Sequence, residues 1–527
     1  MIVDPITLEV LRNALEAVAQ EMGAVLKLTA FSPNIKERMD ASTAIFDARA
    51  QLVAQAEHVP VHLGAMMRAM PAILARSGPL DPGDVIVVND PFVGGAHLPD
   101  ITLVAPVHVR GDVDDRLVGY LACRAHHSDV GGMEPGSMPG RSTEVFQEGL
   151  IIPPVRLVRA GTEQADVMAL ILANVRTPEE RRGDLNAQLA SLRVGARRLA
   201  ELAGRYGADA LVAGFDAILD YSERRMRRRL AELPPGTYVA EDCLDDDGTS
   251  DEPVPIRLSV TVTPERLVLD FSGTASQRAG NVNAVAPMAQ SAAFFAVKVL
   301  TDPTLPPNAG VLRAIEIRIP EGSVLDAQAP AAVCAGNTET TQRVCDTVLR
   351  AFAQVAPDRI PAASQGTMNL IGIGGRDPRT GRSYTYIETI CGGQGGRPRG
   401  PGMDAVQVNM TNTLNTPVES LEIAYPLRVE RYELRGEPGG RGRHPGGRGV
   451  VRALRVLDHE ARVSLQTDRR RHAPYGLHGG EDGKPGLNRL VERDGTVRIL
   501  PGKGSYSVGA DEVVIVETPC GGGWGAP

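Results

Sequence analysis

Aromatic residues are scarce in this 527-residue chain. Phe, Trp and Tyr together make up 4% of it, and there is a single Trp. Proteins that bind nucleic acid commonly combine aromatic stacking platforms with surplus positive charge. The formal net charge here is −8, so we expect no nucleic-acid or anionic-membrane partner. The hydrophobic core is expected to consist of Ala, Val, Leu and Ile.

Long apolar runs and paired cysteines are also missing. No window approaches the roughly 18 uninterrupted apolar residues of a membrane-spanning helix. The start, MIVDPITLEV, lacks the basic and apolar regions of a secretory signal. Six scattered cysteines form no C-x-x-C pair, which argues against a disulfide framework or a thiolate zinc site. These absences predict a cytoplasmic enzyme or enzyme subunit.

Motifs for nucleotide binding and serine nucleophiles are absent as well. The chain has no G-x-x-x-x-G-K-[ST] and no dinucleotide fingerprint after a strand. It also has no G-x-S-x-G nucleophile elbow. If the reaction uses ATP, we therefore expect the ATP to bind to another polypeptide.

The most informative stretch that is present predicts a β-hairpin. Its strands are expected at about Ile101–His108 and Leu117–Arg124, joined by a polar turn at Gly111–Asp115. In an antiparallel hairpin, residues equally far from the turn centre lie opposite each other. The predicted centre near Val113 therefore defines which side chains meet at the open end.

Histidine and aspartate side chains converge at that open end. His97 and Asp100 stand 16 and 13 positions before the centre, and His126, His127 and Asp129 stand 13, 14 and 16 positions after it. Imidazole and carboxylate groups arriving from two strands predict a site for Zn²⁺, Mn²⁺ or Fe²⁺. Such a metal lowers the pKa of a bound water toward neutrality.

Adjacent histidines point to opposite faces of a continuing strand, so one of His126 and His127 is expected to be a ligand. We favour His126. Either His127 or Asp129 would then serve as general base, although His127 could also be a packed histidine. His108 lies beside the turn, and a structural role is expected for it.

A second histidine pair, His58 and His62, has the H-x-x-x-H spacing of a metal-binding helix face. Pro60 between them disfavours a helix. We therefore predict loop residues near the site and no direct ligand role.

The fold is predicted to be mixed α/β (α+β) and multidomain, with antiparallel sheets. Hydrophobic periodicity and Gly/Pro clusters suggest four segments. They are an N-terminal metal-site α/β domain (1–160), a helical block (161–235), an α/β domain (236–425) and a Gly/Arg-rich β domain (426–527). The helical block is expected to be an interdomain spacer or a subunit interface. The Gly/Pro-rich stretch Gly131–Gly149 is a candidate lid over the site.

An ordered series of motifs runs nearly end to end and resembles the hydantoinase B / 5-oxoprolinase B family. The motifs are DPITLEVLRNAL, SPNIKERMDASTAIFD, HVPVHLGAM, GDVIVVNDPFVGGAHLPDITLVAPV, RAHHSDVGGMEPGSMP, LDFSGTASQRAGNVNA, NMTNTLNTPVESLE and the PGG-rich segment. The family includes B-type subunits of ATP-dependent N-methylhydantoinases and is related to subunits of acetone and acetophenone carboxylases.

The resemblance implies a hetero-oligomer in which an actin-like A-type ATPase, with ATP and Mg²⁺, phosphorylates a carbonyl oxygen of a lactam, hydantoin or ketone. The B-type chain would hold a divalent metal and complete the reaction. Carried onto this sequence, it implies metal ligation by His97, Asp100 and one of His126 and His127. Asp40 is implied as an additional ligand by the resemblance alone.

Three functions follow from these residues and from the resemblance. The leading one is the metal-bearing subunit of an ATP-dependent cyclic amide hydrolase, acting on hydantoin, 5-oxoproline or another lactam. The second is a subunit of an ATP-dependent ketone carboxylase. The third is a scaffold subunit without chemistry, which predicts no bound metal.

Overall fold

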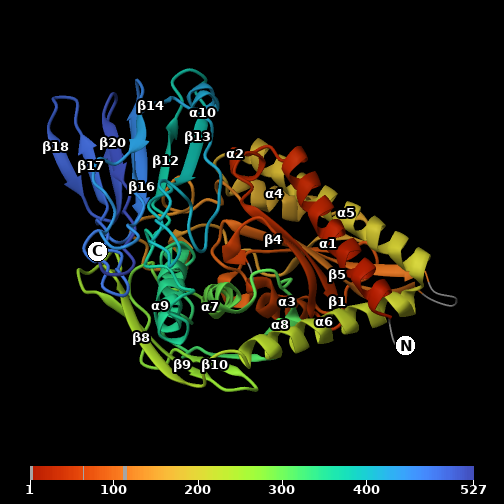
Figure 1. Cartoon of the computed structure of the whole chain (residues 1–527). Coiled ribbons are helices and arrows are strands. Elements are labelled where there is room, and N and C mark those ends of the chain that lie inside the picture. The colour runs from red at the N-terminus through yellow and green to blue at the C-terminus, as the bar shows by residue number, and fades with distance from the viewer. Residues whose placement is uncertain (1–3, 63, 111–114) are drawn as a thin grey trace.

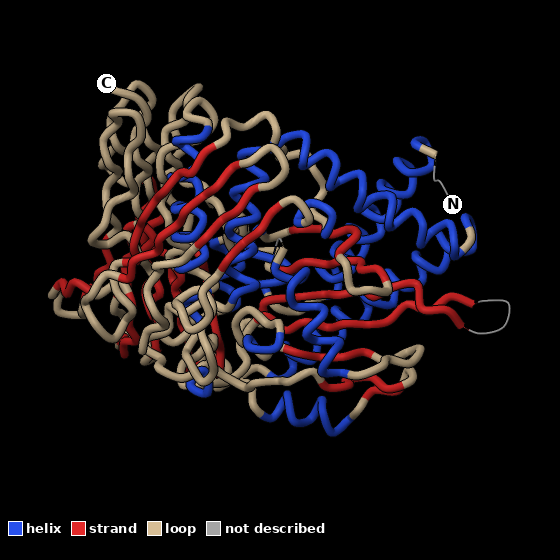
Figure 2. The backbone as a smooth tube through the Cα atoms, turned by 90° about the horizontal axis from the view of Figure 1, so that it is seen from below, coloured by secondary structure: helices blue, strands red, loops and turns tan. Residues whose placement is uncertain are grey.

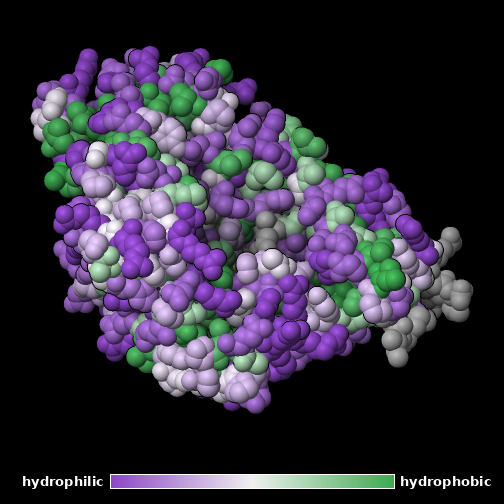
Figure 3. All heavy atoms as spheres, viewed as in Figure 1, coloured by the Kyte–Doolittle hydropathy of each residue, from purple (hydrophilic) through white to green (hydrophobic). Residues whose placement is uncertain are grey.

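Helices and mainly antiparallel sheets mix along the whole chain, which confirms the predicted α+β class (Figure 1). The computed structural model describes residues 4–62, 64–110 and 115–527. Within these ranges, no helix combines the length and the apolar character that crossing a membrane would require. Polar side chains cover most of the face in Figure 3, with apolar ones in small separate patches.

The N-terminal part is built on a seven-stranded sheet in the order β2-β1-β5-β4-β3-β6-β7. Every neighbouring pair in it is antiparallel. Its strands are β1 (Ala41–Asp47), β2 (Leu52–Glu57), β3 (Val85–Val88), β4 (Asp100–Arg110), β5 (Asp115–His126), β6 (Val155–Arg159) and β7 (Thr162–Glu163). Short elements connect them: α2 (Pro33–Lys36), η1 (Pro60–His62), α3 (Ala65–Ser77), η2 (Pro91–Val93) and η3 (Val145–Gln147).

Strands β4 and β5 form the predicted hairpin in the predicted register. Asp100 pairs with His126 and Ile101 with Ala125, and the register shifts only beyond Val107, toward the turn. Of the predicted turn at Gly111–Asp115, residues 111–114 lie outside the described ranges. The open end of the hairpin therefore carries the histidine and aspartate side chains as the spacing predicts.

Helix α1 (Pro5–Thr29) ends where its periodicity predicts. The Asp4 carboxylate caps it by accepting hydrogen bonds from the backbone N–H groups of Ile6 and Thr7 at 3.0 and 3.1 Å. Its buried stripe contains Leu11, Leu15, Val18 and Met22 as predicted, but its last member is Leu26 in place of the predicted Val25.

The predicted helical block consists of α4 (Ala165–Ala173), α5 (Pro178–Tyr206) and α6 (Ala208–Leu230). Helix α5 packs against α1, β4 and β5 (Figure 1), so the block covers the sheet that carries the candidate site. Buried residues such as Leu185, Leu192 and Leu199 face that sheet and α1. The block is part of the N-terminal core.

The middle of the chain contains a four-stranded sheet and two buried helices. The sheet order is β11-β10-β9-β8, antiparallel apart from the parallel pair β10 and β11. The elements are β8 (Gly236–Leu244), β9 (Val254–Val262), β10 (Leu267–Asp270), α7 (Ala286–Thr301), α8 (Ala309–Leu312), β11 (Ile315–Arg318), η4 (Cys334–Gly336) and α9 (Thr340–Val355).

Two further sheets, β13-β12-β16-β19 and β14-β15-β20-β17-β18, form the C-terminal part. Strand β12 pairs with β16, so the segments 236–425 and 426–527 share a sheet. The elements are β12 (Leu370–Arg376), β13 (Ser383–Thr389), α10 (Val418–Ala424), β14 (Leu427–Leu434), β15 (Val450–Val456), β16 (Ala461–Gln466), β17 (Leu487–Val491), β18 (Val497–Leu500), β19 (Lys503–Val508) and β20 (Val513–Glu517).

The glycine-rich segments near the C-terminus pack backbone against backbone, among the loops gathered there in Figure 2. Gly447 donates its N–H to Gln394, and Gly521 donates its N–H to Gly447, at 2.8 and 2.9 Å. A Cβ on Gly521 would lie 2.1 Å from the Gln394 carbonyl oxygen. Glycine is needed there because no side chain fits between the segments.

A buried network of charged side chains joins the middle of the chain to the C-terminal part. Arg343 of α9 contacts Asp468 at 2.9 Å, and Arg469 contacts Asp242 of β8 at 2.7 Å and Asp346 of α9 at 2.9 Å. Charges so far from water are tolerated only when they are paired and hydrogen-bonded. The network therefore ties β8, α9 and the segment after β16 together.

Glu339, just before α9, is a buried carboxyl with little support for a charge. Its Oε1 accepts one hydrogen bond, from the Met368 N–H at 3.3 Å. Its Oε2 has no hydrogen-bond partner within the described residues. Burial, together with the nearby Asp468 carboxylate, raises the pKa of Glu339 from 4.5 to about 8. At neutral pH this side chain is therefore mostly uncharged.

We predict that Glu339→Gln reduces the loss of stability on raising the pH. Between pH 4.5 and about 8, native Glu339 keeps a proton that the unfolded chain releases, so the free energy of unfolding falls as pH rises through this window. The slope from one such group is at most about 1.4 kcal/mol per pH unit. Urea unfolding at pH 5, 6.5 and 8 measures it. The exposed Glu419→Gln should leave the slope unchanged, and parallel profiles for wild type and Glu339→Gln would contradict the prediction.

Candidate metal centre

Three side chains meet at the open end of the β4–β5 hairpin. His97 Nε2 lies 3.2 Å from Asp100 Oδ1 and 3.1 Å from His126 Nδ1, and His126 Nδ1 lies 3.1 Å from Asp100 Oδ1. All three residues are buried. They form the one metal-type cluster of His, Cys, Asp and Glu found within residues 4–62, 64–110 and 115–527.

The loop that carries His97 is held by the side chain of Asn89. Its Nδ2 donates to the carbonyl oxygens of Leu98 and Leu150 at 2.8 and 2.9 Å, and its Oδ1 accepts from the Ile152 N–H at 2.6 Å. One amide thus satisfies three backbone groups of two segments. This fixes the chain directly beside His97, although the loop has no regular ladder.

The proton position on His97 follows from its outer contact. Its Nδ1 lies 3.1 Å from the Cys334 carbonyl oxygen, which can only accept, so Nδ1 carries the hydrogen and Nε2 presents a lone pair to the cluster. Asn337 Nδ2 lies 3.1 Å from His97 Nε2 and 3.3 Å from Asp100 Oδ2. Residues about 240 positions away in sequence therefore complete the surroundings.

The geometry fits a divalent metal ion. Ligand atoms around a tetrahedral zinc with bonds of about 2.0–2.1 Å lie about 3.3 Å apart. The three distances of 3.1–3.2 Å between the facing donor atoms match this spacing. Two imidazole nitrogens and one carboxylate oxygen suit Zn²⁺, Mn²⁺ or Fe²⁺, and the contact between His97 and Cys334 is the outer support that metal-bound histidines usually have.

The electrostatics of the cluster favour an ionised Asp100. Burial alone would raise its pKa, but the charge of His97 and hydrogen bonds from the neighbouring histidines hold it well below its ordinary value. Burial likewise opposes a charge on His97, yet the Asp100 carboxylate outweighs it and raises the His97 pKa. Carboxylate and imidazole thus stabilise each other's charged forms, and a metal cation would take the place of the proton.

His62 lies closer to the cluster than the sequence predicts. Its Nε2 is 3.5 Å from Asp100 Oδ2, and its Nδ1 is 3.1 Å from Ser42 Oγ. The Ser42 hydroxyl donates to the Ala41 carbonyl, so it accepts from His62 Nδ1 and leaves Nε2 facing Asp100. The signal in the sequence was the HVPVH motif, in which His62 closes the short η1 helix. His58 does not join, and burial lowers its pKa.

The two residues predicted as general bases lie away from the cluster. His127 Nε2 contacts Gln188 Oε1 of α5 at 3.0 Å, and burial lowers the His127 pKa to about 4. The Asp129 carboxylate accepts from the backbone N–H groups of Gly131, Gly136 and Arg176 at 3.0 Å, and it pairs with the Arg176 guanidinium. His126 and His127 thus point in different directions, as expected for neighbours on one strand.

Asp40, implied as a ligand by the resemblance, stands at the start of β1 beside the hairpin. Its backbone carbonyl accepts the His126 N–H at 3.0 Å, and its negative charge contributes to the raised pKa of His97. Its carboxylate is not a member of the cluster of three. Asp40 is therefore placed next to the centre and acts on it through its charge.

The predicted lid at Gly131–Gly149 is wedged between the N-terminal and C-terminal parts. Buried Glu148 accepts the N–H groups of Val333 and Cys334 at 3.0 and 3.1 Å, and burial raises its pKa. The Pro139 carbonyl accepts from Gln466 of β16 at 2.9 Å. The segment thus holds Cys334, whose carbonyl orients His97.

The whole chain matches one protein family. The family model described as Hydantoinase B/oxoprolinase covers residues 4–527. An uncharacterised Methanocaldococcus jannaschii protein is 39% identical, with 99% of this chain and 91% of the relative covered. A putative D-/L-hydantoinase B-type subunit from a Pseudomonas strain is 32% identical, with 100% and 90% covered. Arabidopsis thaliana 5-oxoprolinase 1 is 36% identical, and the chain spans 42% of its length.

Two solved structures share the fold over almost the full chain. The crystal structure of the ATP-dependent caprolactamase from Pseudomonas jessenii superposes with a TM-score of 0.93 at 30% identity, covering 100% of this chain and 92% of that one. An acetone carboxylase structure superposes with a TM-score of 0.89 at 17% identity, covering 99% and 76%, which shows a common fold. From the motif series, the hairpin geometry and these matches, this chain belongs to the hydantoinase B/oxoprolinase family.

Proposed function

We propose that this chain is the metal-bearing B-type subunit of an ATP-dependent cyclic amide hydrolase. It would act on a carbonyl that an A-type ATPase partner has activated by phosphorylation. The observation that carries the proposal is the convergence of His97, Asp100 and His126, with facing donor atoms 3.1–3.2 Å apart. A scaffold protein has no need for a buried set of ligands at metal-binding spacing.

His97, Asp100 and His126 would hold the metal, and Asp40 would add negative charge beside it. A divalent metal bound there supplies a water of lowered pKa and a Lewis acid for a carbonyl oxygen. The other nearby groups orient the ligands: the Cys334 carbonyl holds His97, and Asn337 contacts both His97 and Asp100. We assign His127 and Asp129 to positioning the strand end, because their polar contacts lie outside the cluster.

His62 is the residue we propose to move the proton. With Nδ1 donating to Ser42, its Nε2 can accept a proton from an attacking water, and Asp100 Oδ2 at 3.5 Å stabilises the resulting charge. His62 is buried at the same site, which excludes bulk water from the transfer. Its distance from the cluster allows both the metal and a reacting water to fit.

The substrate class rests on the relatives. A caprolactamase, 5-oxoprolinases and a putative hydantoinase chain are all named for cyclic amides, which are poor electrophiles until the carbonyl oxygen is activated. The chain spans less than half of the 5-oxoprolinases, and its extent agrees with that of the hydantoinase B-type chain. This supports an ATP-binding partner on a separate polypeptide.

We predict that the purified chain binds about one Zn, Mn or Fe ion, and that His97→Ala and His126→Ala each lose it. Removing one of three ligands should weaken affinity at least 100-fold, and neither change should unfold the hairpin. Elemental analysis of dialysed protein, with circular dichroism to check folding, measures this. His108→Ala is the matched control on the same strand, β4, and should keep the metal. Stoichiometric metal in both ligand variants would refute the centre.

We predict that the chain, reconstituted with an A-type ATPase, opens a lactam or hydantoin ring with matched release of phosphate. A panel of 5-oxoproline, hydantoin and caprolactam, followed by mass spectrometry, identifies the substrate. Labelled bicarbonate is included in each reaction. Label in the product would assign the chain to a carboxylase, and turnover that persists with His97→Ala would contradict a reaction at this centre.

We predict that His62→Gln lowers kcat of the reconstituted complex about 100-fold while the metal content stays at the wild-type level. The glutamine keeps the volume of the side chain but cannot take up a proton, and positioned acid–base groups contribute about 10²–10⁴-fold. The pH profile of kcat should lose its acidic limb in the variant. Loss of metal in His62→Gln would instead make His62 a ligand, and unchanged turnover would show that it is a bystander.

A further inference from the structure

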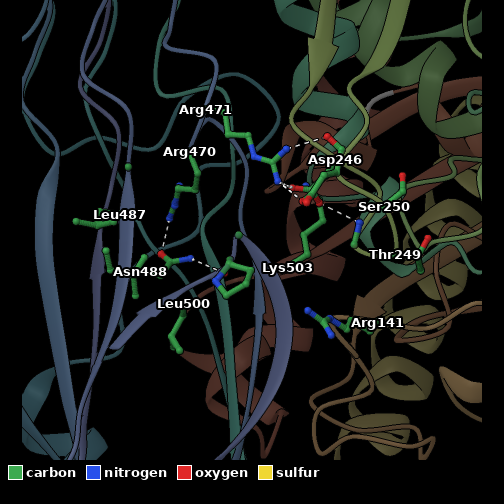
Figure 4. A pocket seen from close by; sticks show the side chains of 16 residues that line it. Arg141, Asp246, Thr249, Ser250, Arg470, Arg471, Leu487, Asn488, Leu500 and Lys503 are labelled. Carbon is green, nitrogen blue, oxygen red and sulfur yellow. Dashed lines mark hydrogen bonds and ion pairs between the residues drawn. The ribbon is translucent and has the colours of Figure 1, made fainter. Parts of the chain in front are cut away.

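A large pocket lies on the other side of the molecule's central junction, away from the candidate metal centre. Its volume is about 720 Å³, within the range of small-molecule sites. One wall is the Asp246–Asp251 loop between β8 and β9, and the opposite wall is formed by β17, β18 and β19 (Figure 4). It shares no lining residue with the cluster of His97, Asp100 and His126.

Basic side chains outnumber acidic ones in the lining of this pocket. The basic ones are Arg141, Arg470, Arg471 and Lys503, and the acidic ones are Asp246 and Asp251. Two of the cations are already neutralised. Arg471 pairs with Asp251, and Lys503 pairs with Asp468 at 2.8 Å and with Asp246 at 3.4 Å.

Arg470 and Arg141 supply the uncompensated charge. The guanidinium of Arg470 donates to two neutral oxygens, the Asp468 backbone carbonyl at 2.7 Å and Asn488 Oδ1 at 2.8 Å. Its Nε is buried without a hydrogen-bond partner in the part of the chain that is described. Burial lowers the Arg470 pKa to about 10, as expected for a cation that lacks a counter-ion.

Arg141 stands across the pocket from Arg470, on the segment that follows Pro139 (Figure 4). Its side chain is exposed. Within the described ranges it forms no ion pair, whereas most arginines of this chain do. Its guanidinium is therefore free to meet a ligand.

The remaining lining is apolar and belongs to the strand wall. Leu487, Leu500 and Pro501 line it, and the strongly exposed Ile499 extends it to the rim. An apolar wall facing a cationic one suits a ligand that has a carbon skeleton as well as negative charge.

We propose that this pocket binds a small organic anion, carrying carboxylate or phosphate groups, between Arg141 and Arg470. The anion neutralises the buried Arg470 and the free Arg141, and its carbon atoms contact Leu500 and Pro501. Guanidinium groups bind both carboxylate and phosphate through paired hydrogen bonds. The site is independent of the metal centre, so each can fail without the other.

Isothermal titration of the dialysed full-length chain with citrate and with glycerol 2-phosphate, at constant ionic strength, tests the proposal. We expect one saturable site per chain for at least one of them, and the tighter ligand identifies the class as carboxylate or phosphate. Arg141→Gln should weaken binding at least tenfold. Ser250→Asp, which adds a negative charge at an exposed position of the lining, should weaken it similarly.

Arg76→Gln, an exposed arginine at the end of α3, is the matched control and should bind like wild type. Both pocket variants change exposed side chains, so circular dichroism should show an unchanged fold. Absence of saturable binding for both anions overturns the proposal. It is also overturned if Arg141→Gln and Ser250→Asp bind as wild type does, or if binding is lost with His97→Ala alone, since the anion would then occupy the metal centre.

Discussion

The pairing register of β4 and β5 is the constraint on which the candidate centre depends. Asp100 lies opposite His126, so both side chains point to the same face of the sheet. A slip of one residue would turn one of them to the other face. The register is held because both strands are buried between neighbours in the middle of a seven-stranded sheet, with α5 packed on it. The long helical block thus stabilises a geometry set by a few residues at the strand ends.

Contacts from distant parts of the chain complete what the hairpin begins. The carbonyl that orients His97 belongs to Cys334, and the backbone of Cys334 is held in turn by Glu148. Asn337, three residues further on, reaches both His97 and Asp100. Ligands on the N-terminal sheet therefore depend on a loop from the middle of the chain. Such outer contacts set the ring orientation and proton position that a metal-binding histidine needs.

The C-terminal part contributes by holding that loop in place. Gln466 of β16 contacts the Pro139 carbonyl and Cys334 Sγ at 2.9 and 3.0 Å. Two residues further, Asp468 enters the buried charge network with Arg343 of α9. Backbone contacts between glycines, such as Gly447 and Gly521, anchor the C-terminal segments with no space for side chains. The charge network and the close backbone packing explain why this family uses the full chain to build one small centre.

The sequence by itself determined the elements and patterns that depend on neighbouring residues. Helix α1, strands β15 and β16, the hairpin register and the convergence of His97, Asp100 and His126 all follow from periodicity and spacing, which act over short distances. Only the tertiary structure decided the rest. It brought His62 to Asp100, turned His127 toward Gln188, and set Asn337 and Cys334 against His97. These contacts join residues up to about 240 positions apart, and their geometry depends on how whole sheets and loops pack, which no local pattern encodes.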